Sequence, residues 1–262
     1  MKLSILIPTV NNIDYIKLFV DSVRESIDTD YEILVYANQA TMEMVDYLKS
    51  EIFTYTEVSE VNRGVAYPCN RLASRATGDV IMYAGDDHFV APGWDKAIEE
   101  KLNPNIFYQY MTPCLFEPQW DNKCMNAPMD YGRTIQTFDK ERFLKEWKTV
   151  RRIKADIVSP WGPPILTKKL WEHIGGFSEE FPIFASDSDM VAKIYTMAQH
   201  AKQPFEFRGL ADCGFYHFQS VTTSRLSNLP AHQMNSKQQF REKWGLLPME
   251  LYDNVLGAGK QI

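Results

Sequence analysis

The stretch Ala76-Thr-Gly-Asp-Val-Ile-Met-Tyr-Ala-Gly-Asp-Asp-His88 decides the fold class of this chain. It joins an apolar run, residues 79–84, to two carboxylates and an imidazole. A continuous apolar run is typical of a strand that is buried on both faces of a parallel sheet. Ligands of open α/β sheets bind beyond the carboxyl ends of the strands, so the polar residues after this run indicate a binding site.

The segments before this stretch alternate between strands and helices. We expect strands at 3–7, 31–37 and 53–58, and helices at 14–26, 41–49 and 66–76. Gly78 is expected to end the last of these helices in a left-handed conformation. Strands and helices that alternate through short links are typical of right-handed strand–helix–strand units in a doubly wound α/β sheet.

The pattern changes after about residue 100, but the chain shows no internal repeat or linker, so we expect a single domain. The spacing predicts strands at 105–112 and 205–209, and helices at 138–150, 168–174, 190–201 and 233–244. Residues 113–132 are rich in Pro, Asn and Asp and are expected to form a polar loop.

The composition is that of an ordinary globular protein of 262 residues, with 45% apolar and 24% charged residues. The 28 Lys and Arg against 34 Asp and Glu give a net charge of −6, which disfavours a nucleic-acid partner. No apolar run approaches the ~18 to 20 residues of a membrane-spanning helix, and the first ten residues are expected to form a strand rather than a signal peptide. We therefore expect a cytoplasmic protein without a membrane span.

The cysteines support the same compartment. Cys69, Cys114, Cys124 and Cys213 form no Cys-x-x-Cys pair and are too sparse for a disulfide scaffold. We expect four reduced thiols without a catalytic role, with a Cys114–Cys124 bridge as the open alternative.

The acidic cluster at residues 86–88 is the densest candidate site. Carboxylate oxygens with one imidazole nitrogen suit Mn²⁺ or Mg²⁺ better than a structural zinc, which favours thiolates. If the segment is extended, Asp86 and His88 face one side and Asp87 the other. The alternative is an acidic turn that caps a helix.

Other polar residues also follow expected strands or lie in nearby turns. Taken singly, each is as readily explained by turn or helix structure. They are Pro8, Thr9, Asn11, Asn38, Arg63 and Asn70.

Taken together and in order, the motifs resemble glycosyltransferase family 2 of the GT-A fold. In the first half they are Ser4-Ile-Leu-Ile-Pro-Thr, Glu32-Ile-Leu-Val, Asn62-Arg-Gly with Asn70, and Gly78-Asp leading into Asp86-Asp-His. In the second half they are the Gly-Gly-Phe-Ser-Glu segment from Gly175, Ser186-Asp-Ser-Asp, and the late His217 before residues 220–224. The resemblance spans residues 3 to 225.

The resemblance implies a divalent cation, Mn²⁺ or Mg²⁺, held by Asp86, His88 and His217. A metal there would act as a Lewis acid on the diphosphate leaving group of a nucleotide sugar. It also implies that Asp187 is the general base that deprotonates an acceptor hydroxyl, with the cap of a helix beginning near Met190 as the alternative. The candidate donor-binding residues are Pro8, Thr9, Asn11, Asn38, Arg63, Asn70, Asp86 and Asp87, together with Trp161, whose ring in the Trp-Gly-Pro-Pro turn could offer an aromatic face to a sugar. For Trp161 a position in the core is the alternative.

Three positions depart from the family pattern. The usual Asp after the second strand is replaced by Tyr36-Ala-Asn38, which puts the base contacts in doubt. The Glu of the family's Glu-Asp pair is Ser186. The third residue of Asp-x-Asp is His88, and an Asp-x-His motif with a late histidine is similar to that of the polypeptide N-acetylgalactosaminyltransferases, which are retaining enzymes.

The expected architecture is one GT-A domain, a Rossmann-like, mostly parallel sheet flanked by helices. It divides into a nucleotide-binding half (1–100), an acceptor-binding half (101–225) and a C-terminal helical extension (226–262). The expected activity is metal-dependent transfer of a sugar from a UDP-linked donor to a glycan or other hydroxyl acceptor, with inversion. A retaining transferase and an inactive nucleotide- or glycan-binding module are the open alternatives. A nucleotidyltransferase is disfavoured because Pro8-Thr-Val-Asn-Asn lacks a basic, Gly-rich loop. The sugar, the acceptor and the oligomeric state are not decided by the sequence.

Overall fold

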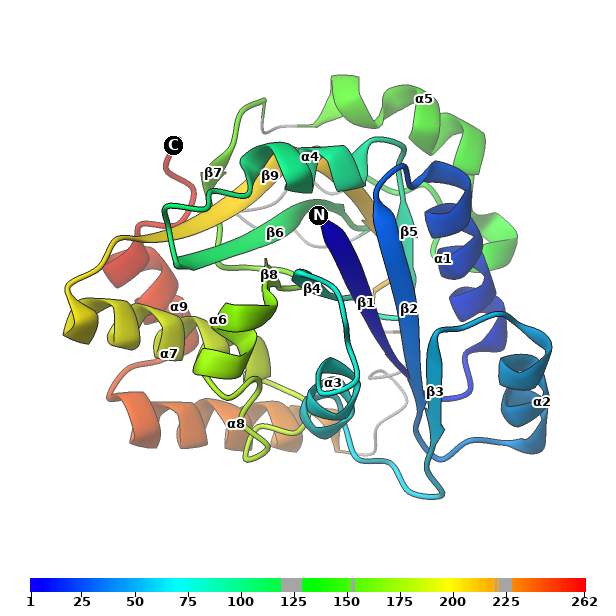
Figure 1. The fold of residues 1–262 in the computed structure, drawn as a ribbon, viewed down its shortest axis with the longest axis horizontal. Coiled ribbons are helices and arrows are strands. Elements are labelled where there is room, and N and C mark those ends of the chain that lie inside the picture. The colour runs from blue at the N-terminus through cyan, green and yellow to red at the C-terminus, as the bar shows by residue number, and fades with distance from the viewer. Residues whose placement is uncertain (119–128, 152–153, 220, 222–227) are drawn as a thin grey trace.

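A single mixed sheet organises the chain (Figure 1). The computed structural model describes residues 1–118, 129–151, 154–219, 221 and 228–262. Over these residues the sheet has nine strands in the order β3-β2-β1-β4-β8-β6-β9-β5, with β7 paired to β9. This confirms an α/β fold with helices on both faces of a sheet.

The first half is the parallel part of the sheet. Strands β1 (Lys2–Thr9), β2 (Asp30–Ala37), β3 (Tyr55–Val58) and β4 (Val80–Tyr83) pair in parallel. The intervening helices are α1 (Ile13–Ser26), α2 (Met42–Ser50) and α3 (Ala66–Ala73). Alternate residues of β1 pack into two different core clusters, one with α1 and one with α3, as expected for a strand covered on both faces. The expected strands and helices of this half are confirmed.

Antiparallel pairs join the second half to β4. Strand β8 (Ile165–Thr167) pairs antiparallel with β4 and with β6 (Tyr108–Phe116). Strand β9 (Phe205–His217) runs parallel to β6, and both β5 (His88–Val90) and β7 (Ile157–Val158) pair antiparallel with β9. Strand β9 is much longer than the expected 205–209, and residues up to Phe116 of the expected polar loop belong to β6.

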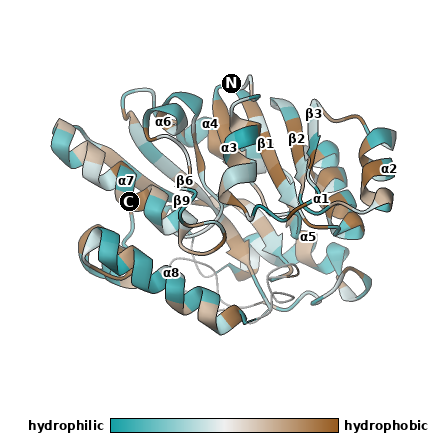
Figure 2. Cartoon of the chain, turned by 90° about the horizontal axis from the view of Figure 1, so that it is seen from below, coloured by the Kyte–Doolittle hydropathy of each residue, from teal (hydrophilic) through white to brown (hydrophobic). Residues whose placement is uncertain are grey.

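Helices and turns cover the remainder of the described chain. They are α4 (Trp94–Lys101), η1 (Ile135–Thr137), α5 (Lys140–Val150), α6 (Lys168–His173), α7 (Ser186–Ala201), α8 (Leu229–Trp244), α9 (Pro248–Glu250) and a π-helical segment, η3 (Leu251–Leu256). Figure 2 shows that α8 is mostly hydrophilic; Phe240 is its fully buried large side chain. No helix in the described ranges is long and apolar enough to cross a membrane.

Gly78 has a different role from the one expected. Helix α3 ends at Ala73, so Gly78 lies beyond its C-terminus, and its backbone is not left-handed. A Cβ at Gly78 would lie 2.6 Å from the Ser4 Oγ and 2.7 Å from the Lys2 carbonyl oxygen. The glycine is therefore required by the close approach of the 77–79 turn to β1.

The described cysteines agree with the expected reduced state. Cys69 and Cys213 are buried free thiols, and Cys114 is buried as well. Cys124 lies outside the described residues.

Candidate active site

The register of the sheet brings two of the predicted metal ligands together. In the antiparallel pair of β5 and β9, His88 lies directly opposite His217. Their rings stack with centroids 4.6 Å apart and planes 14° from parallel. Residues opposite each other on one face of an antiparallel pair have adjacent side chains, so the contact follows from the strand pairing itself.

Asp87, and not Asp86, faces these histidines. The Asp87 Oδ1 lies 3.5 Å from the His217 Nε2 and 3.9 Å from the His88 Nδ1. The expected alternation, with Asp86 and His88 on one side, is wrong because residues 86–87 form a turn before β5 rather than an extended strand. The Asp87 carboxylate also accepts from the Val221 N–H at 3.2 Å.

Asp86 points toward the end of β1 instead. Its Oδ2 accepts from the Thr9 Oγ at 2.5 Å and from the Asn12 Nδ2 at 3.1 Å. Burial, together with the charge of Asp87, raises the pKa of Asp86 to about 7. Asp86 therefore ties the acidic turn to the first strand, and its protonation is sensitive to any cation bound nearby.

The charges of the two histidines differ. Burial and the neighbouring His217 lower the pKa of His88 to about 4, so His88 is neutral near pH 7. Burial disfavours the charged form of His217, but Asp87 and Glu117 outweigh it and raise its pKa to about 10. Burial likewise opposes ionisation of Asp87, yet the two imidazoles hold the pKa of its carboxyl below the usual range.

The donor set fits a divalent cation, although the described side chains do not form a ready metal cage of three His, Cys, Asp or Glu residues. The His88 Nε2 is buried and has no hydrogen-bond partner in the described part of the chain. A buried nitrogen without a partner is costly unless it has another function, such as coordination. The adjacent Asp87 carboxylate and His217 Nε2 supply oxygen and nitrogen ligands of the type that Mn²⁺ accepts.

Asp187 lies in the first turn of α7. That helix begins at Ser186 rather than near Met190, and its N-cap is Ala185 with φ of 62°, so Asp187 is not the cap. Burial raises the pKa of the Asp187 carboxyl, partly offset by hydrogen bonds from the backbone of Ser188 and of Asp187 itself. A carboxylate with a raised pKa is a better proton acceptor at neutral pH.

Tyr83, the last residue of β4, has a phenol that feels the charge of several carboxylates of the site region. Burial raises the pKa of Tyr83 well above its usual range, and nearby carboxylates add to the shift. These carboxylates are Asp86, Asp87 and Asp187. All three carboxylates therefore add to the rise in the pKa of one phenol.

Three of the predicted donor-binding residues lie where the strands β1 and β2 end. The Asn38 Nδ2 donates to the Gly64 carbonyl at 3.0 Å, and its Oδ1 accepts from the Arg63 N–H at 2.8 Å. The exposed Arg63 guanidinium lies 5.3 Å from the Tyr67 ring centroid. Asn11 bonds to the 39–41 turn through the Gln39 carbonyl at 2.9 Å. Asn38 therefore holds the turn that presents Arg63.

Three others are placed differently. Asn70 bonds through both ends of its amide to the backbone of Phe177, at 2.8 and 3.0 Å. Trp161 packs edge-on to Tyr252 with centroids 4.7 Å apart. Pro8 is buried within β1. Thus Asn70 links α3 to the segment after α6, and Trp161 packs against the C-terminal segment as well as the core clusters.

Two residues of the site region were not assigned a role from the sequence: Asn12 binds Asp86, and Glu117 binds His217. Asp189, the last residue of the Ser186-Asp-Ser-Asp motif, anchors α8 through Trp244. The rule that points to polar residues after buried strands would have found Glu117, had the end of β6 been placed at Phe116 rather than at residue 112.

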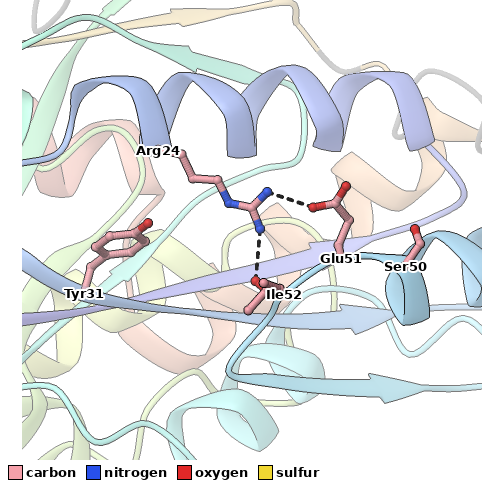
Figure 3. A pocket seen from close by; sticks show the side chains of 5 residues that line it. All are labelled: Arg24, Tyr31, Ser50, Glu51 and Ile52. Atoms are coloured by element: carbon pink, nitrogen blue, oxygen red, sulfur yellow. Dashed lines mark hydrogen bonds and ion pairs between the residues drawn. The ribbon is translucent and has the colours of Figure 1, made fainter.

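A shallow pocket lies away from these residues, between α1 and the end of α2 (Figure 3). There the Arg24 Nη1 pairs with the Glu51 Oε2 at 2.8 Å, and its Nη2 donates to the Ile52 carbonyl at 3.0 Å. None of the candidate site residues lines it.

Comparison with known proteins agrees with the resemblance. Residues 4–113 match the family model described as glycosyl transferase family 2. No curated protein sequence gives a match. Among solved structures, the mannosyltransferase PcManGT from Pyrobaculum calidifontis, in complex with GDP-Man and Mn²⁺, is similar with a TM-score of 0.62 and 16% identity. The match covers 98% of this chain and 68% of that one.

Two further structures have the same fold. S. aureus TarS (1–349) gives a TM-score of 0.57 at 15% identity, with 94% of this chain and 74% of that chain covered. GalNAc-T7 with UDP, GalNAc and Mn²⁺ gives 0.57 at 14% identity; 97% of this chain is covered but only 57% of that one. The chain thus has the fold of these GT-A glycosyltransferases, and its residues 4–113 match the family 2 model.

Proposed function

We propose that the chain transfers a sugar from a UDP-linked donor to a hydroxyl acceptor, with a divalent cation and with inversion. The observation that carries the proposal is the pairing of His88 with His217 beside the carboxylate of Asp87. The orphaned His88 Nε2 supports the metal, and so do the Mn²⁺ complexes of PcManGT and GalNAc-T7. UDP in the structures of GalNAc-T7 and TarS supports the nucleotide, whereas PcManGT holds GDP-Man.

His88 and His217 would hold the cation together with one or both carboxylates of the acidic turn. Asp87 already faces both rings, while Asp86 remains the ligand that the sequence predicts. When bound, the metal supplies positive charge that neutralises the diphosphate leaving group. Thr9 and Asn12 keep Asp86 oriented, so the turn is organised before any ligand arrives.

Asp187 would act on the acceptor. As the acceptor oxygen attacks the anomeric carbon and the bond to the diphosphate breaks, the Asp187 carboxylate takes the hydroxyl proton. Its partly buried position in the first turn of α7 and its raised pKa favour this role. A retaining transferase remains the second candidate, because the Asp-x-His motif with a late histidine is also found in that group.

We assign the donor to residues 1–100, the acceptor to residues 101–225, and a structural role to residues 226–262. The match of residues 4–113 to the family model supports the first assignment. The buried free thiols of Cys69 and Cys213 suit the reducing, cytoplasmic compartment in which we place the enzyme.

The first test is incubation with a panel of UDP- and GDP-sugars and Mn²⁺, with and without EDTA, read as release of nucleoside diphosphate. We expect release with a UDP-sugar that EDTA abolishes. His217→Ala should lose metal-dependent donor binding, whereas the exposed His200→Ala should not. Asp86→Asn and Asp87→Asn, measured against the exposed Asp46→Asn, separate the two carboxylates as ligands. Donor binding without release in any condition would instead identify a binding module.

The second test concerns inversion. Asp187→Asn preserves size and should leave donor affinity unchanged while turnover falls by about 10² to 10⁴. The product anomer, identified by NMR, should be inverted. Nearly full turnover in Asp187→Asn together with a retained anomer would assign the chain to the retaining group.

A further inference from the structure

Glu117 lies where β6 ends, next to the candidate metal site. Phe116 pairs with Tyr216 in the parallel ladder of β6 and β9, so the next residues, Glu117 and His217, are neighbours across the two strands. The Glu117 side chain is 8% exposed, and its Oε1 lies 2.5 Å from the His217 Nδ1. Its main-chain carbonyl separately accepts from the Met129 N–H at 3.0 Å. The side chain can thus be changed without removing a donor or acceptor from the backbone.

This contact constrains how His217 can bind a metal. An ionised carboxylate only accepts hydrogen bonds, so the His217 nitrogen that faces Glu117 must carry a proton. The other nitrogen, Nε2, lies 3.5 Å from the Asp87 Oδ1. A cation that binds Nε2 would displace the second proton of the His217 imidazolium, and the proton kept on Nδ1 by Glu117 leaves the lone pair on Nε2, toward Asp87. The stacked His88 ring, 4.6 Å away, restricts the remaining tilt of the His217 ring.

We infer that Glu117 is a positioning residue for the metal site: it fixes the tautomer and the ring orientation of His217 so that Nε2 is presented to the cation. Such carboxylate–histidine–metal arrangements raise the basicity of the histidine and pre-organise it. The inference rests on the proposed metal-dependent function. It adds Glu117, a residue outside the motifs and outside the segment matched by the family model, to the machinery of the site.

The test measures Mn²⁺ binding in the presence of UDP, by calorimetry, for the full chain and three variants. Loss of a supporting carboxylate typically costs 10- to 100-fold in metal affinity, and we expect a rise in Kd of about that size for Glu117→Ala. Glu117→Gln keeps an acceptor oxygen for the Nδ1 proton and should recover most of the affinity. The exposed Glu99→Ala is the matched control and should bind Mn²⁺ as the wild type does.

A second readout follows the tautomer directly. The measurement uses the Mg²⁺-bound protein, which is diamagnetic. In the wild type the ¹⁵N chemical shifts of the His217 ring should report a single tautomer, protonated at Nδ1. In Glu117→Ala the same shifts should report a mixture of the two tautomers. If that variant does not fold, the same shifts in Glu117→Gln test the inference. Wild-type metal affinity and an unchanged tautomer in a folded Glu117→Ala would overturn it. Absence of Mn²⁺ binding by the wild type would instead overturn the metal in the proposed function, and this inference with it.

Discussion

Removal of the Asp189 carboxylate should strongly destabilise the attachment of α8 to α7. The Asp189 side chain is fully buried, and its Oδ1 accepts from the Trp244 Nε1 at 2.9 Å and lies 2.7 Å from the Lys243 Nζ. Its Oδ2 accepts from the Ser178 Oγ at 2.5 Å. One carboxylate therefore joins two positions on α8 to the first turns of α7 and to the segment before it.

The magnitude follows from what Asp189→Ala leaves behind. Removal of one partner of a buried ion pair costs about 3 to 5 kcal/mol, because the other charge remains buried and unpaired. Lys243 is 29% exposed and still reaches the Glu180 Oε1, so its own loss is reduced. In Asp189→Ala the indole N–H of Trp244 loses the acceptor that Asp189 provides. We therefore expect the lower end, about 3 kcal/mol, for Asp189→Ala. About 2 kcal/mol is expected for Asp189→Asn, which retains an acceptor oxygen.

The assay is urea denaturation followed by tryptophan fluorescence. The control is Glu99→Ala, which removes a pair with Lys96 in which both side chains are more than 40% exposed. Exposed pairs contribute about 0 to 1 kcal/mol. An Asp189→Ala protein that loses no more free energy of unfolding than Glu99→Ala would refute the view that this cluster anchors α8.

Three further predictions concern the frame around the site. Burial opposes ionisation of Glu32, yet hydrogen bonds from Ser4 and the 77–78 turn hold its pKa below 4.5. Ionised Glu32 therefore contributes its full stabilisation of the folded protein above pH 4.5, and this contribution is lost as the pH falls through the pKa of Glu32 in the folded state. Between about pH 5 and about pH 3 the free energy of unfolding, measured in urea, should fall more for the wild type than for Glu32→Gln. An equal fall in the two proteins would contradict this. Gly78→Ala should cost about 1 to 3 kcal/mol by thermal or urea unfolding, since its Cβ would meet β1 backbone; an unchanged stability would remove that explanation. Asn70→Ala removes both bonds to Phe177 and should cost about 2 kcal/mol in the same assay, whereas a neutral result would free Asn70 for the donor role.

The parallel half of the fold was readable from the sequence for a simple physical reason. A strand covered on both faces carries a near-continuous apolar run, as in residues 5–8 of β1, residues 33–37 of β2 and all of β4. The helices between them bury one stripe, which leaves a helical spacing such as Ile16, Phe19, Val20 and Val23 in α1. In this half of the chain, the residues that the apolar spacing marks are therefore the ones that the fold buries.

The second half was less readable because its decisive strands are short. Strands β5, β7 and β8 have three, two and three residues, too few for a periodicity to emerge. The late histidine and Asp187 came from the order of motifs, not from strand pattern. The prediction that Asp86 and His88 face one side and Asp87 the other was wrong. Side chains alternate only along an extended backbone, and residues 86 and 87 form a turn.

The pairing of β5 with β9 makes the candidate site dependent on the whole chain. In the described sheet β5 lies at the edge and pairs with β9, so the residues after the acidic turn take their conformation from a strand far along the sequence. The Phe218 N–H also bonds to the Asp87 carbonyl at 3.0 Å, which extends that ladder into the turn. The segment matched by the family model ends at 113 and therefore contains His88 without His217 or Glu117. The strand pairing, and not a contiguous motif, therefore brings the two histidines together.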